Sequence, residues 1–236
     1  MNIYTEQVKD KHYSQPIQAS LLKHSQEYRV LATLRYLFPQ KYDKMVARES
    51  PDLQDLENSI GVEVTAAVRE DDMRATSAFS KFCRASSNRE MQKYITAIES
   101  SGYSIVSIQG SKSAISTTGT SNGEKIFFQK SIRKKKVKLS QYRENFNVLG
   151  LAIVLPEIPT SEAESHFIDW ICEVFREDDD LYDFVYVLSC RFCIYYDVQA
   201  DYSQKRPISR EEHTLLCTIA RMTAEGELTL DDQEWQ

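Results

Sequence analysis

Apolar and polar residues alternate along the stretch from Ile60 to Val68. Every second residue of this stretch, starting with Ile60, is apolar, while Glu63 and Thr65 fall on the opposite side. Side chains of a β-strand point to alternate faces of the sheet, so the pattern predicts a strand with one face in the core. Its other face carries a carboxylate.

The residues before this strand predict a β-hairpin. A two-residue turn at 57–58 would pair Leu53 with Val62 and would set Asp52 directly opposite Glu63. The two like charges would then have Cβ atoms roughly 5 Å apart, which is unfavourable unless a cation lies between them. The hairpin therefore predicts a site for a divalent metal ion.

Hydrophobic periodicity and capping residues predict the remaining elements. Helices are expected at 26–38, 73–84, 87–101, 124–146, 161–176 and 209–224, and strands at 44–49, 103–108, 148–155, 183–188 and 192–198. The continuously apolar strand 148–155 is typical of a central strand covered on both faces. This order predicts an α/β (α+β) fold, with a mixed central sheet flanked by helices.

The same pattern predicts how the chain is divided. We expect an N-terminal arm at 1–24, a main domain at 25–200, and a C-terminal helix with an acidic tail at 201–236. The pattern changes after the hairpin, so 71–123 is expected to be an insertion of helices and a loop. Its last part, 109–123, is rich in Ser, Thr and Gly, which favours a mobile loop.

Composition places the chain in the globular class, with 42% hydrophobic and 27% charged residues. The longest plainly apolar run is too short to cross a bilayer, and the polar first residues lack the apolar centre of a signal peptide. The five cysteines are an odd number without framework spacing, which is typical of reduced thiols. We expect a cytoplasmic protein with no membrane partner.

Charge is distributed unevenly along the chain. The net charge of −6 argues against nucleic acid as a partner, because binding there depends on phosphate neutralisation. The segment 125–143, however, contains eight bases and no acid, which is compatible with binding of a phosphate backbone. Its expected nucleic-acid contacts are Lys130, Arg133, Lys134 and Lys136. The alternative is a solvated helix face with no ligand.

One lysine of this segment lies on an apolar stripe. Ile132, Lys135, Leu139, Tyr142 and Phe146 follow one another at spacings of three and four, so they share one side of the predicted helix. A lysine on the buried edge of a helix has two explanations. It serves a buried site, or its aliphatic stem covers the core while its ammonium group reaches water.

These motifs carry a family resemblance. Pro51-Asp52 followed by Ile60-Gly-Val-Glu63-Val-Thr65 resembles the core of the PD-(D/E)XK nuclease superfamily, which has the restriction-endonuclease-like fold. The resemblance implies that Asp52 and Glu63 hold Mg²⁺ or Mn²⁺, with the main-chain carbonyl of Val64 as a third ligand. The family pattern has a lysine where this chain has Thr65, whose hydroxyl supplies no fixed positive charge.

The resemblance also implies where that lysine has moved. The segment from Ile132 to Tyr142 resembles the helix that carries the catalytic lysine in some branches of the superfamily, so Lys135 and then Lys138 are the candidates. Lys138 and Tyr142 are similar to the Gln-x-x-x-Tyr element of the exonuclease branch, with Lys in place of Gln, which adds Tyr142 to the expected nucleic-acid contacts. In several branches an acid of the leading helix reaches the metal, which makes Glu27 a third acid. Its alternative role is a charge favoured at a helix N-terminus.

The resulting hypothesis is a metal-dependent nuclease that hydrolyses phosphodiester bonds, with DNA favoured over RNA. A catalytically inactive nuclease-fold domain that binds nucleic acid or a protein partner is the first alternative, because the lysine at position 65 is missing. An unrelated α/β protein is the second. The sequence is also compatible with a homodimer.

Overall fold

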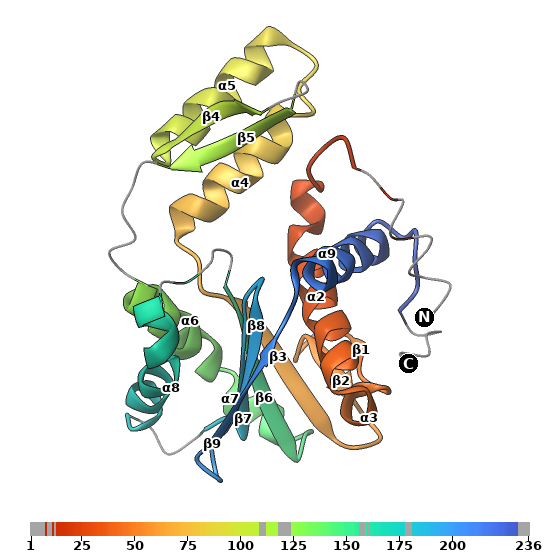
Figure 1. Cartoon of the computed structure of the whole chain (residues 1–236), viewed down its shortest axis with the longest axis vertical. Helices are drawn as coiled ribbons and strands as arrows, with labels where there is room; N and C mark the ends of the chain where they lie inside the picture. Colours follow the sequence, from red (N-terminus) through yellow and green to blue (C-terminus); the bar gives the residue numbers. More distant parts are fainter. Residues whose placement is uncertain are drawn as a thin grey trace. The chain divides into compact units, whose positions relative to one another are not determined.

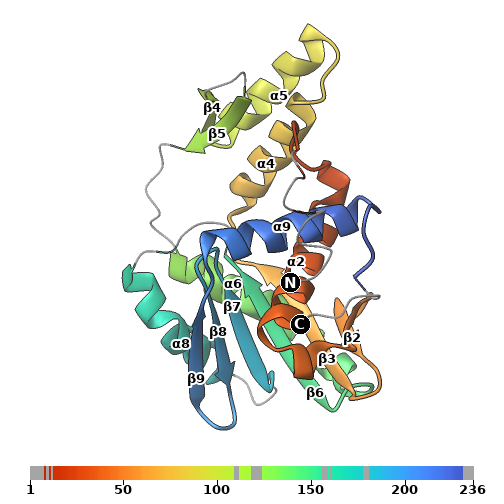
Figure 2. The same cartoon turned by 45° about the vertical axis from the view of Figure 1, so that its right-hand side comes forward.

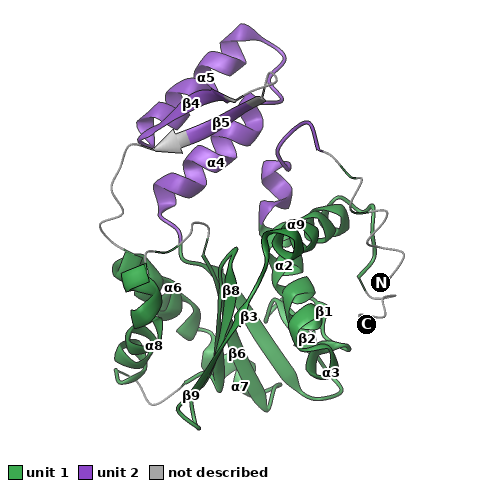
Figure 3. Cartoon of the chain, viewed as in Figure 1, with its two compact units in different colours: residues 1–11, 23–67, 124–236 green, residues 12–22, 68–123 purple. Residues whose placement is uncertain are grey.

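The computed structural model describes residues 8, 11, 13–108, 112–117, 124–155, 159, 161–177 and 181–230 (Figure 1). The chain divides into two compact units (Figure 3). Unit 1 comprises 1–11, 23–67 and 124–236, and unit 2 comprises 12–22 and 68–123. No described helix has the length and apolar character needed to cross a membrane.

Unit 1 is built on a seven-stranded mixed sheet with the strand order β1-β2-β3-β6-β7-β8-β9. The strands are β1 (Val46–Ala47), β2 (Leu53–Asp55), β3 (Ile60–Ala66), β6 (Val148–Val154), β7 (Phe184–Leu188), β8 (Phe192–Asp197) and β9 (Tyr202–Pro207). The central strands β3, β6 and β7 are parallel, and the pairs toward both edges are antiparallel. The structure thus confirms the predicted mixed α/β class.

Helices cover both faces of this sheet (Figures 1 and 2). One face is covered by α6 (Glu124–Lys136), α7 (Leu139–Arg143) and α8 (Ser161–Phe175), and the other by α2 (Leu22–Leu37), α3 (Pro39–Tyr42) and α9 (Arg210–Ala224). Because α2 begins at Leu22, after a short 3-10 turn at Ala19–Leu21, the end of the stretch expected as an arm is helical.

The single helix predicted at 124–146 is wrong. It is interrupted at Val137 and Lys138, between α6 and α7. Like charges one turn apart destabilise a helix interior, whereas bases are favourable beside the carbonyls of a helix C-terminus. The run from Arg133 to Lys136 forms the last turn of α6, so these bases lie where positive charge is favourable.

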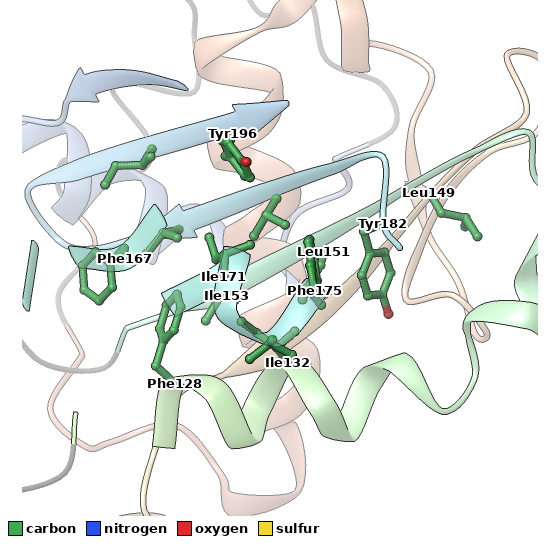
Figure 4. Close-up of a cluster of buried hydrophobic side chains, with 14 of the residues drawn as sticks. Phe128, Ile132, Leu149, Leu151, Ile153, Phe167, Ile171, Phe175, Tyr182 and Tyr196 are labelled. Carbon is green, nitrogen blue, oxygen red and sulfur yellow. The ribbon is translucent and has the colours of Figure 1, made fainter. Parts of the chain in front are cut away.

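A large apolar cluster fills the space between the sheet and the helices α6 and α8. Figure 4 shows Phe128 and Ile132 of α6 facing Phe167, Ile171 and Phe175 of α8. The rings of Phe128 and Phe167 stack with centroids 4.9 Å apart. The alternating side chains of β6 complete the cluster, which holds α6 in a fixed position over β3 and β6.

The strand β9 was missed by the sequence patterns. Its side chains are mostly exposed and polar, so it shows no apolar alternation, and it forms the outer edge of the sheet beside β8. The first strand is also shorter than the predicted 44–49, because only Val46 and Ala47 pair with β2.

Unit 2 consists of two helices and a small antiparallel sheet. Helices α4 (Glu70–Phe82) and α5 (Asn88–Ser100) confirm the two predicted helices, and β4 (Tyr103–Ile108) confirms the short strand. The predicted loop at 109–123 is wrong for β5 (Lys112–Thr117), which pairs with β4. The rest of that loop, 109–111 and 118–123, lies outside the described residues.

Candidate acid site

The hairpin that carries the acids has the predicted register. Leu53 pairs with Val62 in the β2–β3 ladder, so Asp52 comes one position before the ladder begins, opposite Glu63. The turn is stabilised by Asp55, whose carboxylate accepts hydrogen bonds from the main-chain and side-chain nitrogens of Asn58 at 3.0 and 2.7 Å. Asp55 therefore has a structural role, which leaves Asp52 and Glu63 as the acids of the site.

Both acids are buried, with 5% of Asp52 and 2% of Glu63 exposed. The oxygen Oδ2 of Asp52 accepts a hydrogen bond from the main-chain nitrogen of Val64 at 2.8 Å, which fixes its carboxylate against β3. Two buried carboxylates that lie opposite each other on neighbouring segments of the hairpin repel each other, so a positive charge must compensate them.

Lys135 supplies that charge from α6. Its Nζ atom lies 2.5 Å from Oε1 of Glu63 and 3.5 Å from Oδ2 of Asp52, and 20% of its side chain is exposed. The neighbours Ile132 and Leu139 are buried in the apolar cluster, and the hydroxyl of Tyr182 donates to the Lys135 carbonyl at 3.1 Å. Of the two explanations for a lysine on the apolar stripe, the structure favours the buried site.

A second lysine, which the sequence analysis did not single out, contacts the same acids. Nζ of Lys23 lies 3.0 Å from Oε1 of Glu27 and 3.6 Å from Oδ1 of Asp52. The contact with the Glu27 carboxylate raises the pKa of Lys23, and the charges of Glu27 and Asp52 add to this effect. The spacing of four between Lys23 and Glu27 was visible in the sequence, but the approach of Asp52 depends on the fold.

Glu27 is buried and contacts two bases, of which Lys23 also faces Asp52. One of its oxygens faces Lys23, and the other lies 3.0 Å from Nδ1 of His24. Across the described part of the chain, no three His, Cys, Asp or Glu side chains are grouped so that they could hold a metal ion. Glu27 therefore does not form a three-acid cluster with Asp52 and Glu63, as the resemblance had implied.

Two buried polar atoms beside Lys135 are unsatisfied. Neither Oε2 of Glu63 nor the hydroxyl of Tyr142 has a hydrogen bond of normal geometry to any described residue. Burial and the nearby negative charge of Glu63 raise the pKa of Tyr142. Tyr142 was expected to contact nucleic acid from the basic helix, and the structure places its side chain in the interior, 3% exposed and beside Glu63.

Lys138, the second candidate for the catalytic lysine, is not part of this site. It is exposed at the start of α7 and forms no ion pair with Asp52 or Glu63. Lys138 is not on the stripe that contains Lys135, and it precedes the first residue of α7, where its side chain is exposed.

The basic segment is partly neutralised within unit 1. Arg133 forms two hydrogen bonds with the Glu177 carboxylate, at 2.8 and 3.1 Å, and Lys125 pairs with Glu173 at 2.7 Å. The ammonium group of Lys136 lies 5.6 Å from the centre of the Phe175 ring. Lys130 and Lys134 are exposed on α6. Part of the segment thus stabilises the contact between α6 and α8.

The oxygen atoms at the site suit a hard divalent cation. Alternate residues of a parallel strand turn their main-chain groups to opposite neighbours. Ala67 donates to Val154 of β6, so the main-chain groups of Val64 face away from β6, consistent with the hydrogen bond from the Val64 nitrogen to Asp52. The carboxylates of Asp52 and Glu63 and the main-chain carbonyl of Val64 are all oxygen donors, which Mg²⁺ and Mn²⁺ prefer.

Comparisons of the chain with protein families, with characterised proteins and with solved structures found no match.

Proposed function

We propose that this protein is a metal-dependent nuclease that hydrolyses phosphodiester bonds of nucleic acid, with DNA favoured over RNA. The observation that carries the proposal is the pair of buried carboxylates, Asp52 and Glu63, with the ammonium group of Lys135 between them. A site that only stabilised the fold would not need to leave the second oxygen of Glu63 unpaired.

The resemblance to PD-(D/E)XK nucleases supports the same function. The element order that carries it is a leading helix, an antiparallel meander, a helix and then a strand parallel to the hairpin. That order corresponds to α2, the strands β1 to β3, α6 and β6. Lys135 stands on the helix to which the lysine has moved in some branches, which accounts for Thr65 at the usual position.

Each residue of the site has a defined role in this proposal. Asp52, Glu63 and the main-chain carbonyl of Val64 would hold Mg²⁺ or Mn²⁺, which supplies a water of lowered pKa and charge neutralisation at the phosphate. Lys135 orients the attacking water and stabilises negative charge that develops on the phosphate oxygens. Val64 holds Asp52 in place through its main-chain nitrogen.

The exposed bases of α6 would contribute to substrate binding. Lys130 and Lys134 can neutralise backbone phosphates, and the surplus of positive charge attracts nucleic acid irrespective of sequence. Arg133 and Lys136 would reach phosphate only in competition with Glu177 and the Phe175 ring. A cytoplasmic location and a homodimer stay predictions.

The test is cleavage of labelled DNA and RNA by the full chain in Mg²⁺ or Mn²⁺, with and without a chelator. Asp52→Asn and Glu63→Gln keep the shape of the side chains, so we expect each to reduce cleavage by at least about 100-fold while the protein remains folded. Glu57→Gln is the matched control, because Glu57 lies on the same hairpin but is exposed and pairs with Lys44. Cleavage that persists in both acid variants would reject the proposal.

A second candidate is a catalytically inactive domain of the same fold that binds nucleic acid or a protein partner. Thr65 and the close ion pairs of Lys135 and Lys23 favour it, because these bases already compensate the acids without a metal. Absence of Mg²⁺ and Mn²⁺ binding in a metal titration, together with binding of nucleic acid that does not depend on metal, would select this candidate.

A further inference from the structure

Lys23 stands where a helix does not favour a base. It lies in the first turn of α2, near the positive end of the helix dipole, and that turn contains no acid. Its nearest partner is Glu27, one turn later on the same helix, and its tertiary partners are Asp52 on the hairpin and Glu49 at 4.0 Å. The fold thus adds contacts with the acid site to the ion pair that Lys23 forms within α2.

Two lysines bracket the Asp52 carboxylate from opposite oxygens. Lys23 faces Oδ1, and Lys135 faces Oδ2, which also accepts the hydrogen bond from Val64. The two ammonium groups differ in their freedom, since 60% of the Lys23 side chain is exposed compared with 20% for Lys135. Lys23 can therefore turn into solvent, whereas the stem of Lys135 is held by the packing of α6.

The lysines of the site do not fully compensate its acids. Glu27, Asp52 and Glu63 carry three negative charges when ionised, whereas Lys23 and Lys135 carry two positive ones, and His24 beside Glu27 adds a third only when it is protonated. The buried oxygen Oε2 of Glu63 makes no hydrogen bond of normal geometry to a described residue. Asp52 and Glu63 thus retain oxygen atoms that a divalent cation could use.

We propose that Lys23 is a built-in counter-cation of this site, which occupies Asp52 until a divalent metal ion binds and then turns toward the substrate phosphate. This inference rests on the proposed function and specifies how the same site is regulated. Metal and ammonium group compete for one carboxylate, because a divalent ion at Asp52 repels a base within 4 Å of the same oxygen atoms. Glu27 keeps Lys23 nearby after the exchange.

The test is a titration of the full chain with Mn²⁺, in which free Mn²⁺ is measured by its paramagnetic resonance signal. Lys23→Met removes the competing charge, and we expect it to bind Mn²⁺ about three- to tenfold more tightly than the unmodified protein. Lys23→Arg keeps the charge and should leave the affinity within about twofold. Lys44→Met is the matched control, because Lys44 is also ion-paired with an acid, Glu57, that lies outside the site.

The second measurement is binding of a labelled DNA duplex in the presence of saturating Ca²⁺ in place of Mg²⁺. Lys23→Met should weaken this binding about three- to tenfold, because one phosphate contact is lost. Thermal unfolding of each variant checks that it is folded, and removal of a base from the first turn of α2 is not expected to unfold it.

The outcomes separate this inference from the proposed function. Mn²⁺ affinity that is unchanged or weaker in Lys23→Met overturns the role of Lys23, while binding that depends on Asp52 keeps the metal site. Mn²⁺ binding that is absent, or that is unaffected by Asp52→Asn, overturns both.

Discussion

The two ends of the central sheet solve the problem of buried polar groups in opposite ways. At the end formed by β7 and β8, the hydroxyls of Tyr42 and Tyr186 are buried and bond to each other at 2.8 Å, surrounded by the rings of Phe38 and Tyr195. At the end formed by β2 and β3, charged groups are buried, and the Tyr142 hydroxyl and Oε2 of Glu63 make no hydrogen bond of normal geometry to a described residue, although Tyr142 and Glu63 interact.

Under the proposed function, this difference separates an end that serves stability from an end that serves chemistry. A buried polar pair that is fully satisfied rigidifies a core, whereas unsatisfied buried groups are unfavourable and persist where they have another use. At the aromatic end, the two buried hydroxyls satisfy each other. At the acid end, buried polar atoms lack well-formed hydrogen bonds, and in the proposed function this is the physical reason to place a ligand there.

The largest effect on stability is expected from Lys135→Met. It leaves two buried carboxylates with less compensating charge, so the free energy of unfolding should fall by about 3 kcal/mol, measured by urea denaturation. The double variant Lys135→Met/Glu63→Gln should recover most of this loss. Lys125→Met is the control: Lys125 is on the same helix, but its ion pair with Glu173 is exposed, and its loss should change stability by less than about 1 kcal/mol. Equal losses in the two single variants would show that the acid end is not special.

A smaller effect is expected at the aromatic end from Tyr186→Phe. This change leaves the Tyr42 hydroxyl buried without its partner, which should reduce the free energy of unfolding by about 1–2 kcal/mol in the same urea experiment. A loss below about 0.5 kcal/mol would contradict the view that this end depends on the pair.

Tyr142→Phe is the corresponding change at the acid end, and here we expect a change of less than about 0.5 kcal/mol, or a slight stabilisation. The hydroxyl that is removed interacts with the Glu63 carboxylate but makes no hydrogen bond of normal geometry, so its deletion removes less than the loss of a well-formed bond. A loss as large as that of Tyr186→Phe would show that both ends are satisfied alike, contrary to the comparison.

The smallest effect is expected for an exposed polar pair, Tyr36 and Glu212, which provides a reference value for both ends of the sheet. Glu212 accepts hydrogen bonds from Tyr36 and from the main-chain nitrogen of Ser209, and these contacts lower its pKa. Its folded pKa is below that of the unfolded chain, so ionised Glu212 adds stability above the ordinary pKa of 4.5, and this contribution is lost as pH falls through the lowered value.

We therefore expect Glu212→Gln to be about 0.5 kcal/mol less stable than the unmodified protein at pH 7, with the difference shrinking below pH 4.5. Thermal unfolding across this range measures it. Glu211→Gln, in the same helical turn, controls for the loss of a charge alone, and a difference that grows toward acid pH would have the wrong sign.

Local pattern was sufficient for the parts of the site that lie within one element. Alternation and a short turn fixed the register that brings Asp52 opposite Glu63, and helical spacing placed Lys135 on the buried side of α6. In each case the information lies within about twenty residues of chain, where periodicity determines which side chains share a face.

Contacts between distant elements were not predictable in this way. Lys23 meets Asp52 only because α2 packs beside the hairpin, and a spacing of four residues to Glu27 is common on any exposed helix. The strand β9 was missed because an exposed edge strand needs no apolar face. The break after α6 falls in the basic run, and the hydrophobic stripe continues across it, so the stripe alone does not report the break.

The two outermost strands of unit 1 have a consequence for the behaviour of the protein at high concentration. β1 offers only two paired residues, and β9 ends in Pro207 and carries the exposed Lys205. Short edges, positive side chains and proline all discourage the docking of a foreign strand, which is the usual first step of fibrillar aggregation. The seven-stranded sheet is thus terminated at both margins by its own sequence.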